Sequence, residues 1–207
     1  MNPNYKILRA ILKGVISLFF RIKVKGYPQS IPEGGCLLCA NHLSAVDPAL
    51  IAVSAKQQLW FLAKAELAKV PIVNLLMKNF GIPVTRGTAD LTAIRTCVAA
   101  IKEGKNLLVF PQGTRKKGVD PKTTEVKHGS AMFIYRAKCP VIPVYIEAKN
   151  HKIGIFKKIT ITFGNPISYE DFGFTKGSLP ELKSASELLW KSICDLGNKD
   201  KDAENGN

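Results

Sequence analysis

Residues 35–55 read GCLLCANHLSAVDPALIAVSA, and this stretch decides the fold of the chain. It opens with an unbroken apolar run at residues 37–40, which has the length and composition of a short buried strand. A polar turn follows, and Asp47 and Pro48 then mark the start of a helix expected over residues 48–55. A buried strand that leads through a turn into a helix is the repeating unit of an α/β sheet.

The same alternation of apolar strands and helices continues along the rest of the chain. Gly104, for example, stands where a glycine commonly ends a helix. The pattern therefore predicts an α/β fold with a mostly parallel central sheet that helices cover on both faces. Further strands are expected at residues 59–63, 81–84, 106–110, 141–146 and 158–163, and helices at 72–78, 89–102, 129–137 and 181–196.

A different pattern occupies the N-terminus, where polar and apolar side chains separate onto two sides of a helix expected over residues 5–22. A basic polar face beside a wide apolar face is typical of a helix that lies in a membrane interface. A helix packed on the domain's own core is the alternative. The charge-free stretch 14–20 is far shorter than the roughly twenty apolar residues of a membrane-spanning helix. The polar face consists of Lys6, Arg9, Lys13, Ser17 and Arg21, and the apolar face of Ile7, Leu8, Ile11, Leu12, Val15, Leu18, Phe19 and Ile22.

The 207 residues of the chain are enough for one domain with a sizeable hydrophobic core. We expect the interfacial helix at residues 1–22, the folded domain at 23–197 and a disordered tail at 198–207. The net charge of +14 attracts polyanions such as nucleic acid, anionic lipid headgroups or phosphorylated substrates. Because the sequence has no helix-turn-helix, zinc module or aromatic-rich RNA-binding signature, we expect no nucleic-acid partner.

The five cysteines indicate a reducing compartment, because no secretory signal with a small-residue cleavage site is visible. Cys36 and Cys39 form a CxxC pair inside the apolar run of residues 35–40. A zinc site would need a second pair of this kind or two well-spaced histidines. We therefore expect core cysteines, and a metal or redox site is the alternative. The remaining three are Cys97, Cys139 and Cys194.

His42 and Asp47 lie between the first buried strand and its helix, where α/β proteins place active sites. Histidine is suited to proton transfer near neutral pH, and a carboxylate that accepts its other ring N–H fixes the tautomer. The turn between strand and helix can bring the two side chains together. No GxSxG nucleophile elbow surrounds them, so the pair would deprotonate a hydroxyl that the substrate brings. The alternative is a helix cap at Asp47 and a structural loop histidine.

A second polar turn, FPQGTR at residues 110–115, follows the strand expected at 106–110. Gly113 permits a positive φ or a close backbone approach, and Thr114 offers a hydroxyl. Arg115 carries the planar donor group that suits phosphate. A turn followed by a solvated basic run is the alternative.

Lys64 and Arg86 also follow expected strands, at residues 59–63 and 81–84. If these strands are parallel neighbours, Lys64, Arg86 and Arg115 all stand near the carboxyl ends of strands, at one edge of the sheet. Three cations that converge there would form a cradle for phosphate.

Together, these residues resemble the glycerolipid acyltransferases, the family that includes the 1-acylglycerol-3-phosphate O-acyltransferases. His42 and Asp47 match the family's HX4D motif, and residues 110–115 match its FPEGTR block. Residues 61–67, 81–86 and 141–144 resemble further blocks of the family in the same order. The resemblance covers roughly residues 20–165.

The resemblance implies an O-acyltransferase of phospholipid biosynthesis that works without a metal or a permanently bound cofactor. A fatty acyl group would pass from acyl-CoA or acyl carrier protein to the sn-2 hydroxyl of 1-acylglycerol-3-phosphate, which gives phosphatidic acid. His42 would be the general base, and Asp47 would orient it. The resemblance implies that Arg86, Arg115 and Lys64 hold the acceptor's phosphate, while Gln112, Gly113 and Thr114 shape its site. The enzyme would be monotopic, on the cytoplasmic face of a membrane.

The chain departs from the family at Gln112, where glutamate is usual. Glutamine keeps the size and hydrogen-bonding capacity of glutamate but loses its negative charge. Acceptor identity is therefore the open point, and another lysolipid or a glycerol-like acceptor is the alternative. Outside the enzymes, the alternative is a membrane-surface protein that only binds anionic lipid.

Overall fold

The computed structural model describes residues 2–26, 34–64, 80–84 and 91–198. Their strands form one seven-stranded sheet in the order β1-β7-β6-β2-β5-β3-β4. Strands β6, β2, β5, β3 and β4 are all parallel, while β7 runs antiparallel to β6 and carries β1 parallel to itself. The predicted mostly parallel sheet is confirmed. The strands are β1 (Arg21–Lys25), β2 (Leu37–Ala40), β3 (Leu59–Lys64), β4 (Gly81–Val84), β5 (Asn106–Val109), β6 (Val141–Ala148) and β7 (Lys158–Phe163).

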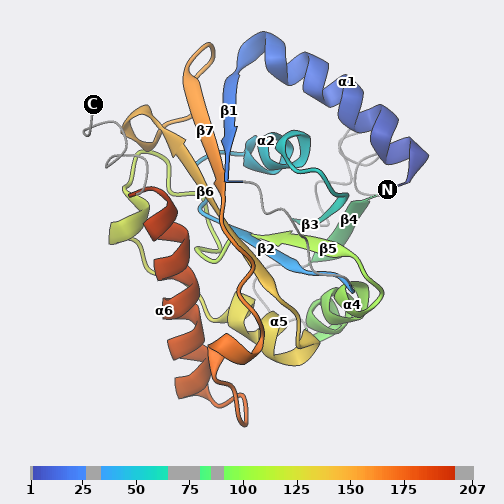
Figure 1. The fold of residues 1–207 in the computed structure, drawn as a ribbon, viewed down its shortest axis with the longest axis vertical. Coiled ribbons are helices and arrows are strands. Elements are labelled where there is room, and N and C mark those ends of the chain that lie inside the picture. Colours follow the sequence, from blue (N-terminus) through green and yellow to red (C-terminus); the bar gives the residue numbers. More distant parts are fainter. Residues whose placement is uncertain (1, 27–33, 65–79, 85–90, 199–207) are drawn as a thin grey trace.

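Helices cover both faces of the sheet, as Figure 1 shows. Helices α1 and α2 pack on one face, and α4, α5 and α6 pack on the other. The predicted α/β fold class is therefore confirmed. The helix expected at residues 72–78 lies outside the described residues. The helices are α1 (Pro3–Phe19), α2 (Asp47–Ser54), α4 (Leu91–Lys102), α5 (Gly129–Ala137) and α6 (Leu179–Leu196), with 3-10 turns at Pro121–Thr123, Lys149–His151 and Glu170–Phe172.

The central strand β2 is buried along its whole length, which explains its unbroken apolar sequence. Leu37 and Cys39 belong to the core on the α4–α6 face, whereas Cys36 and Leu38 belong to the core on the α1–α2 face. The two thiols of the CxxC pair therefore point to opposite faces of the sheet and cannot share a metal ion. All five cysteines are buried and free. Among the described residues, no cluster of His, Cys, Asp and Glu has the makings of a metal site.

The N-terminal helix ends earlier than the helical pattern predicts. Helix α1 stops at Phe19, and Arg21–Lys25 forms β1, which pairs in parallel with β7. The expectation of a helix through residue 22 is therefore wrong at its C-terminal end. Ile22 and Val24 are β-branched, and the strand conformation lets them pair with the open edge of β7. Side-chain periodicity alone does not report such an available edge.

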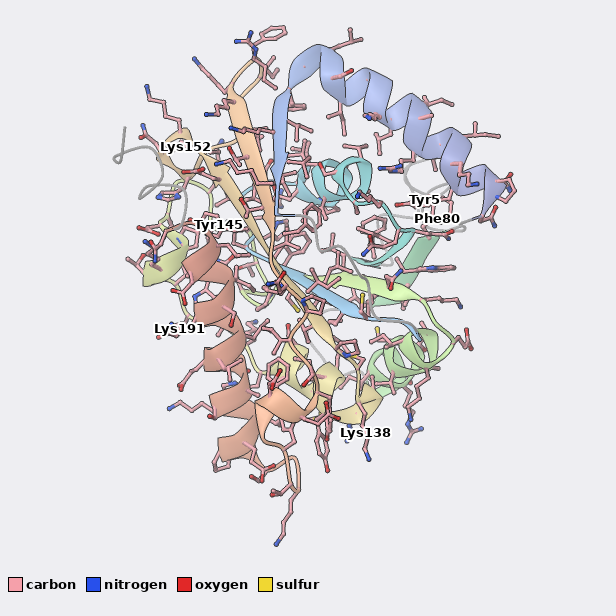
Figure 2. All side chains as sticks on the ribbon, in the orientation of Figure 1. Tyr5, Phe80, Lys138, Tyr145, Lys152 and Lys191 are labelled. Atoms are coloured by element: carbon pink, nitrogen blue, oxygen red, sulfur yellow. The ribbon has the colours of Figure 1, made fainter. Side chains whose placement is uncertain are left out.

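Helix α1 packs on the protein with one face and exposes another. Tyr5 and Ile16 are buried, and the ring of Tyr5 stands edge-on to Phe80 at 4.8 Å (Figure 2). Arg9, a member of the predicted polar face, donates hydrogen bonds to the backbone carbonyls at the end of α2, which include those of Ala52 and Val53. These carbonyls carry the negative end of the helix dipole, so a guanidinium is favoured there.

The outer face of α1 is apolar. We call Ile7, Ile11, Val15 and Leu18 the α1 stripe; their exposed fractions are 62%, 61%, 48% and 69%. Lys6 and Lys13 are exposed as well. Across the described residues, no helix combines the length and the hydropathy required to span a bilayer.

Candidate active site

The turn that follows β2 begins with a buried asparagine. Asn41 is fully buried, and its side-chain amide donates to the carbonyl of Ile146 at 2.9 Å and accepts from the N–H of Ile146 at 2.7 Å. The side chain thus continues the β2–β6 pairing by one further step, where the backbone of β2 turns away. This clamp fixes the direction in which the next residue, His42, leaves the sheet.

His42 and Asp47 are in contact, as the sequence predicts for a turn between strand and helix. Nδ1 of His42 lies 2.8 Å from Oδ2 of Asp47. The same Oδ2 accepts the backbone N–H groups of Leu43 at 2.6 Å and Ser44 at 2.7 Å. Asp47 is fully buried, so its carboxylate is fixed by the turn that it closes. An imidazole that donates Nδ1–H to this carboxylate presents Nε2 as its proton acceptor.

The carboxylate does not cap its helix in the way that the alternative interpretation requires. Helix α2 begins at Asp47 itself, one residue earlier than predicted, and its N-cap is Val46 without a side-chain cap hydrogen bond. Asp47 therefore lies in the first turn, where the positive end of the helix dipole stabilises a negative charge. Because its Oδ2 contacts residues 42–44, Asp47 orients the histidine and does not accept hydrogen bonds from the first N–H groups of the helix.

The histidine ring is held on its other side by Phe110, the residue that follows β5. The two rings are stacked, with centroids 4.0 Å apart and an interplanar angle of 16°. His42 is 9% exposed, so the ring is mostly buried but reaches the surface. Within the described part of the chain, no hydrogen-bond partner is found for Nε2, which leaves this nitrogen open to an incoming hydroxyl.

Gln112 connects the turn at residues 110–115 to the turn of His42. It is 2% exposed; its Oε1 accepts the backbone N–H of His42 at 2.7 Å, and its Nε2 donates to Oγ1 of Thr124 at 2.8 Å. The backbone carbonyl of His42 in turn accepts the N–H of Lys116 at 2.8 Å. These contacts of Gln112 are to the protein itself, and its part in shaping the acceptor site stays a prediction.

Gly113 and Thr114 follow in the same turn. Gly113 has φ +69°, and a Cβ at this position would lie 3.0 Å from the side chain of Lys127. The glycine thus meets both a backbone requirement and a close approach. Thr114 is exposed at the surface of the turn.

A cleft of about 340 Å³ opens beside the turn of His42. Its lining includes Leu43, Ser44 and Ala45 from that turn, and the two cations Arg115 and Lys117. Ile153, from the connection between β6 and β7, adds an apolar side chain. The cleft therefore combines positive charge with apolar surface, which suits an amphiphilic anion.

The other two predicted cations are only partly placed. Lys64 ends β3, which is parallel to β4 and to β5, so its backbone lies at the same sheet edge as His42 and Arg115. The expected parallel pairing of residues 59–63 with 81–84 is confirmed. The side chain of Lys64 and the whole of Arg86 lie outside the described residues.

Sequence reasoning missed four contributors to this site. Lys117 enters the sequence analysis only in the alternative interpretation, as part of a solvated basic run. Ile153 comes from a distant connection that no local pattern ties to residue 42. Asn41 and Phe110 stand inside the two motifs, and their position directly after a buried strand was the available signal.

Comparison with known proteins agrees with this architecture. The profile of the family described as Acyltransferase matches residues 21–147. A 1-acyl-sn-glycerol-3-phosphate acyltransferase of Bacillus subtilis is 28% identical over 199 residues, which are 94% of this chain and 98% of that protein. A probable 1-acyl-sn-glycerol-3-phosphate acyltransferase of Mycoplasma pneumoniae is 30% identical, over 86% of this chain and 74% of its own length.

The fold is also shared with a solved structure. The crystal structure of the 1-acyl-sn-glycerophosphate (LPA) acyltransferase PlsC from Thermotoga maritima superposes with a TM-score of 0.74 at 28% identity. The likeness covers 93% of this chain and 79% of that one. Since the matching profile spans more than half of the residues and includes both polar turns, the chain belongs to the acyltransferase family.

Proposed function

We propose that this protein transfers a fatty acyl group from a thioester to the sn-2 hydroxyl of 1-acylglycerol-3-phosphate, which gives phosphatidic acid for phospholipid synthesis. The observation that carries the proposal is the 2.8 Å contact between His42 and the buried Asp47 beside a basic cleft. Relatives that match nearly the whole chain carry the name of this activity.

In the proposed reaction, Nε2 of His42 removes the proton of the acceptor hydroxyl as its oxygen attacks the thioester carbonyl. Asp47 accepts the Nδ1–H and stabilises the imidazolium that forms. The C–O bond forms, the C–S bond breaks, and the imidazolium returns its proton to the departing thiolate. The substrate supplies the nucleophile, so no acyl-enzyme intermediate is needed. The donor is acyl-CoA or acyl carrier protein, which present the same kind of thioester.

The acceptor's phosphate would bind to the cations of the cleft. Arg115 offers a planar pair of donors, and Lys117 adds a second positive charge to the lining of the cleft. Lys64 and Arg86 are proposed to complete the cradle from the neighbouring strands, as the family resemblance implies. Gly113 and Thr114 would shape the glycerol site, while Leu43 and Ile153 contact the acyl chain.

We further propose that α1 holds the enzyme on the membrane surface from which the acceptor comes. The α1 stripe faces away from the protein, and no acidic residue precedes Glu33, so the positive charges there are not offset locally. Residues 3–19 are then the interfacial helix and residues 21–197 the catalytic domain, associated with the cytoplasmic face as a monotopic protein.

The direct test offers purified protein a panel of acceptors and donors, with products read by mass spectrometry. We expect phosphatidic acid from lysophosphatidic acid, and much less product from lysophosphatidylcholine or monoacylglycerol. Product formed only from a different acceptor would support the alternative lysolipid specificity. Vesicle binding without any acyl transfer would support the lipid-binding alternative and contradict the proposal.

A further inference from the structure

The connection between β6 and β7 ends in two apolar side chains that point into solvent. Ile155 is 58% exposed and Phe156 is 66% exposed. We call these two residues the hairpin tip. Exposed large apolar residues are common singly, but two adjacent ones next to another apolar surface indicate an interaction site.

The backbone of this connection is strained. Phe156 has φ +60°, and Asn150 and His151 have φ +52° and +53°. An aromatic residue in the left-handed region is an outlier, because its side chain crowds the backbone there. Such strain persists where the surrounding structure holds it and is concentrated at functional positions. Here it turns the side chain of Phe156 outward instead of into the core.

The hairpin tip is fixed to the end of α1. The N–H of Phe156 donates to the carbonyl of Phe19 at 2.7 Å, and the N–H of Lys157 donates to the carbonyl of Gly154 at 3.2 Å. Leu18 and Phe19, at the end of the helix, are 69% and 44% exposed. Figure 1 shows the connection that leads into β7 beside the turn from α1 to β1. The tip therefore continues the apolar surface of α1 on a second element.

The charge around the hairpin tip is uniformly positive. Residues 149–158 contain four lysines and no acidic residue, and Lys152, labelled in Figure 2, is exposed with Lys157. Arg21 and Lys23 of β1 are exposed on the adjoining strand. Like charges of this density repel a second copy of a chain that carries +14, whereas they attract an anionic lipid surface.

We propose that the hairpin tip is a second bilayer-contacting element, which inserts beside α1 into an anionic leaflet. This inference rests on the proposed function. Its consequence is geometric: two contact points fix the tilt of the protein, whereas one helix leaves it free to roll about its axis. Ile153 lines the active-site cleft and lies two residues from the tip, so insertion holds the cleft mouth at the bilayer surface.

The test places a tryptophan at the tip. In Phe156→Trp we expect the emission to move to shorter wavelength on addition of phosphatidylglycerol-containing vesicles, and brominated lipid to quench it. Trp60 and Trp190 are present in every variant, so the unsubstituted protein supplies the background. The matched control is Leu179→Trp, at a position 68% exposed at the start of α6. We expect no change in that variant.

A second pair of variants measures the strength of the contact. Ile155→Ser with Phe156→Ser should weaken co-sedimentation with the same vesicles roughly tenfold, whereas Leu179→Ser should leave it unchanged. Unshifted and unquenched emission from the Phe156→Trp variant would overturn the proposal. A shift that needs high protein concentration and no vesicles would also overturn it, in favour of contact between copies. Acylation by the unsubstituted protein is assayed separately, so its absence would count against the proposed function and not against the hairpin tip.

Discussion

The side-chain carbonyl of Gln112 accepts the backbone N–H of His42 at 2.7 Å, and this contact joins the two polar turns of the active site. The amide group of Gln112 donates to Oγ1 of Thr124, whose hydroxyl donates to the carbonyl of Pro121. Glutamine satisfies both ends of this chain, since it offers one acceptor and one donor. A glutamate at position 112 could only accept from Thr124, so the hydroxyl of Thr124 would have to break its hydrogen bond to the carbonyl of Pro121. Gln112 thus positions the histidine through a buried network.

Replacing Gln112 with glutamate should therefore lower kcat and leave acceptor binding intact. A carboxylate cannot donate to Thr124, so the buried network that positions His42 is disturbed. We also expect a loss of about 1 kcal/mol in unfolding free energy from the disturbed hydrogen bonds.

The control for this change is Gln112→Ala, which removes the contact without adding charge. It should also lower kcat and leave the acceptor KM unchanged. A large rise in the acceptor KM in either variant would instead mean that Gln112 contacts the substrate.

Arg115 and Lys117 should increase the affinity of the enzyme for an acceptor that carries a phosphate group. Replacing either by alanine removes a charged donor from the wall of the cleft, so the KM for lysophosphatidic acid should rise about five- to tenfold with little change in kcat. Lys183→Ala, which changes an exposed lysine on α6, is the matched control. Equal KM values in all three variants would remove the two residues from the phosphate site.

The α1 stripe is best tested by substitution, because deletion of the whole helix would also disturb the fold. Deletion would expose Leu59 and the core around Ile16, and it would remove Arg9, which binds the carbonyls at the end of α2. Ile7, Ile11 and Leu18 replaced together by serine should weaken binding to anionic vesicles by about tenfold or more, because each loses apolar area that the bilayer would cover. Sedimentation with vesicles measures this, and circular dichroism should confirm an unchanged fold. Undiminished sedimentation would contradict the interfacial role of the helix.

The cysteines should be inert in the folded protein. Burial raises the pKa of Cys36 and Cys97 to about 12 and of Cys139 and Cys194 to about 11, and the pKa of Cys39 is raised well above its ordinary value. Since the thiolate is the reactive form, a disulfide reagent at pH 8 should label the native chain slowly and five thiols after unfolding. Rapid labelling of Cys36 or Cys39 in the native state would restore the redox interpretation of the CxxC pair.

Local sequence patterns were sufficient for the elements that have a strong local signal. The apolar run of β2, the described helices after it and the polar turn at residues 41–47 are predicted nearly in place, because burial on both faces and helix-start chemistry leave a local trace. The predicted acyltransferase family is confirmed by the family profile, and the predicted α/β fold class by the solved structure that shares the fold.

The features that were missed depend on contacts between distant segments. Strand β1 forms because β7 offers an edge, and Arg9 turns inward because α2 ends beneath it. Gln112 reaches His42 across 70 positions of sequence, and Ile153 enters the cleft from a connection with no motif of its own. No periodicity along the chain reports which segments the sheet brings together.

The most direct test of the central claim is the turnover of His42→Ala with lysophosphatidic acid and an acyl thioester. The ring contacts Asp47 and Phe110 and is 9% exposed, so its removal should leave the fold intact, which an unchanged circular dichroism spectrum would confirm. We predict that kcat falls on the order of 10²–10⁴-fold, because a general base contributes that much. Turnover close to that of the unsubstituted protein would contradict the assignment of His42 as the base.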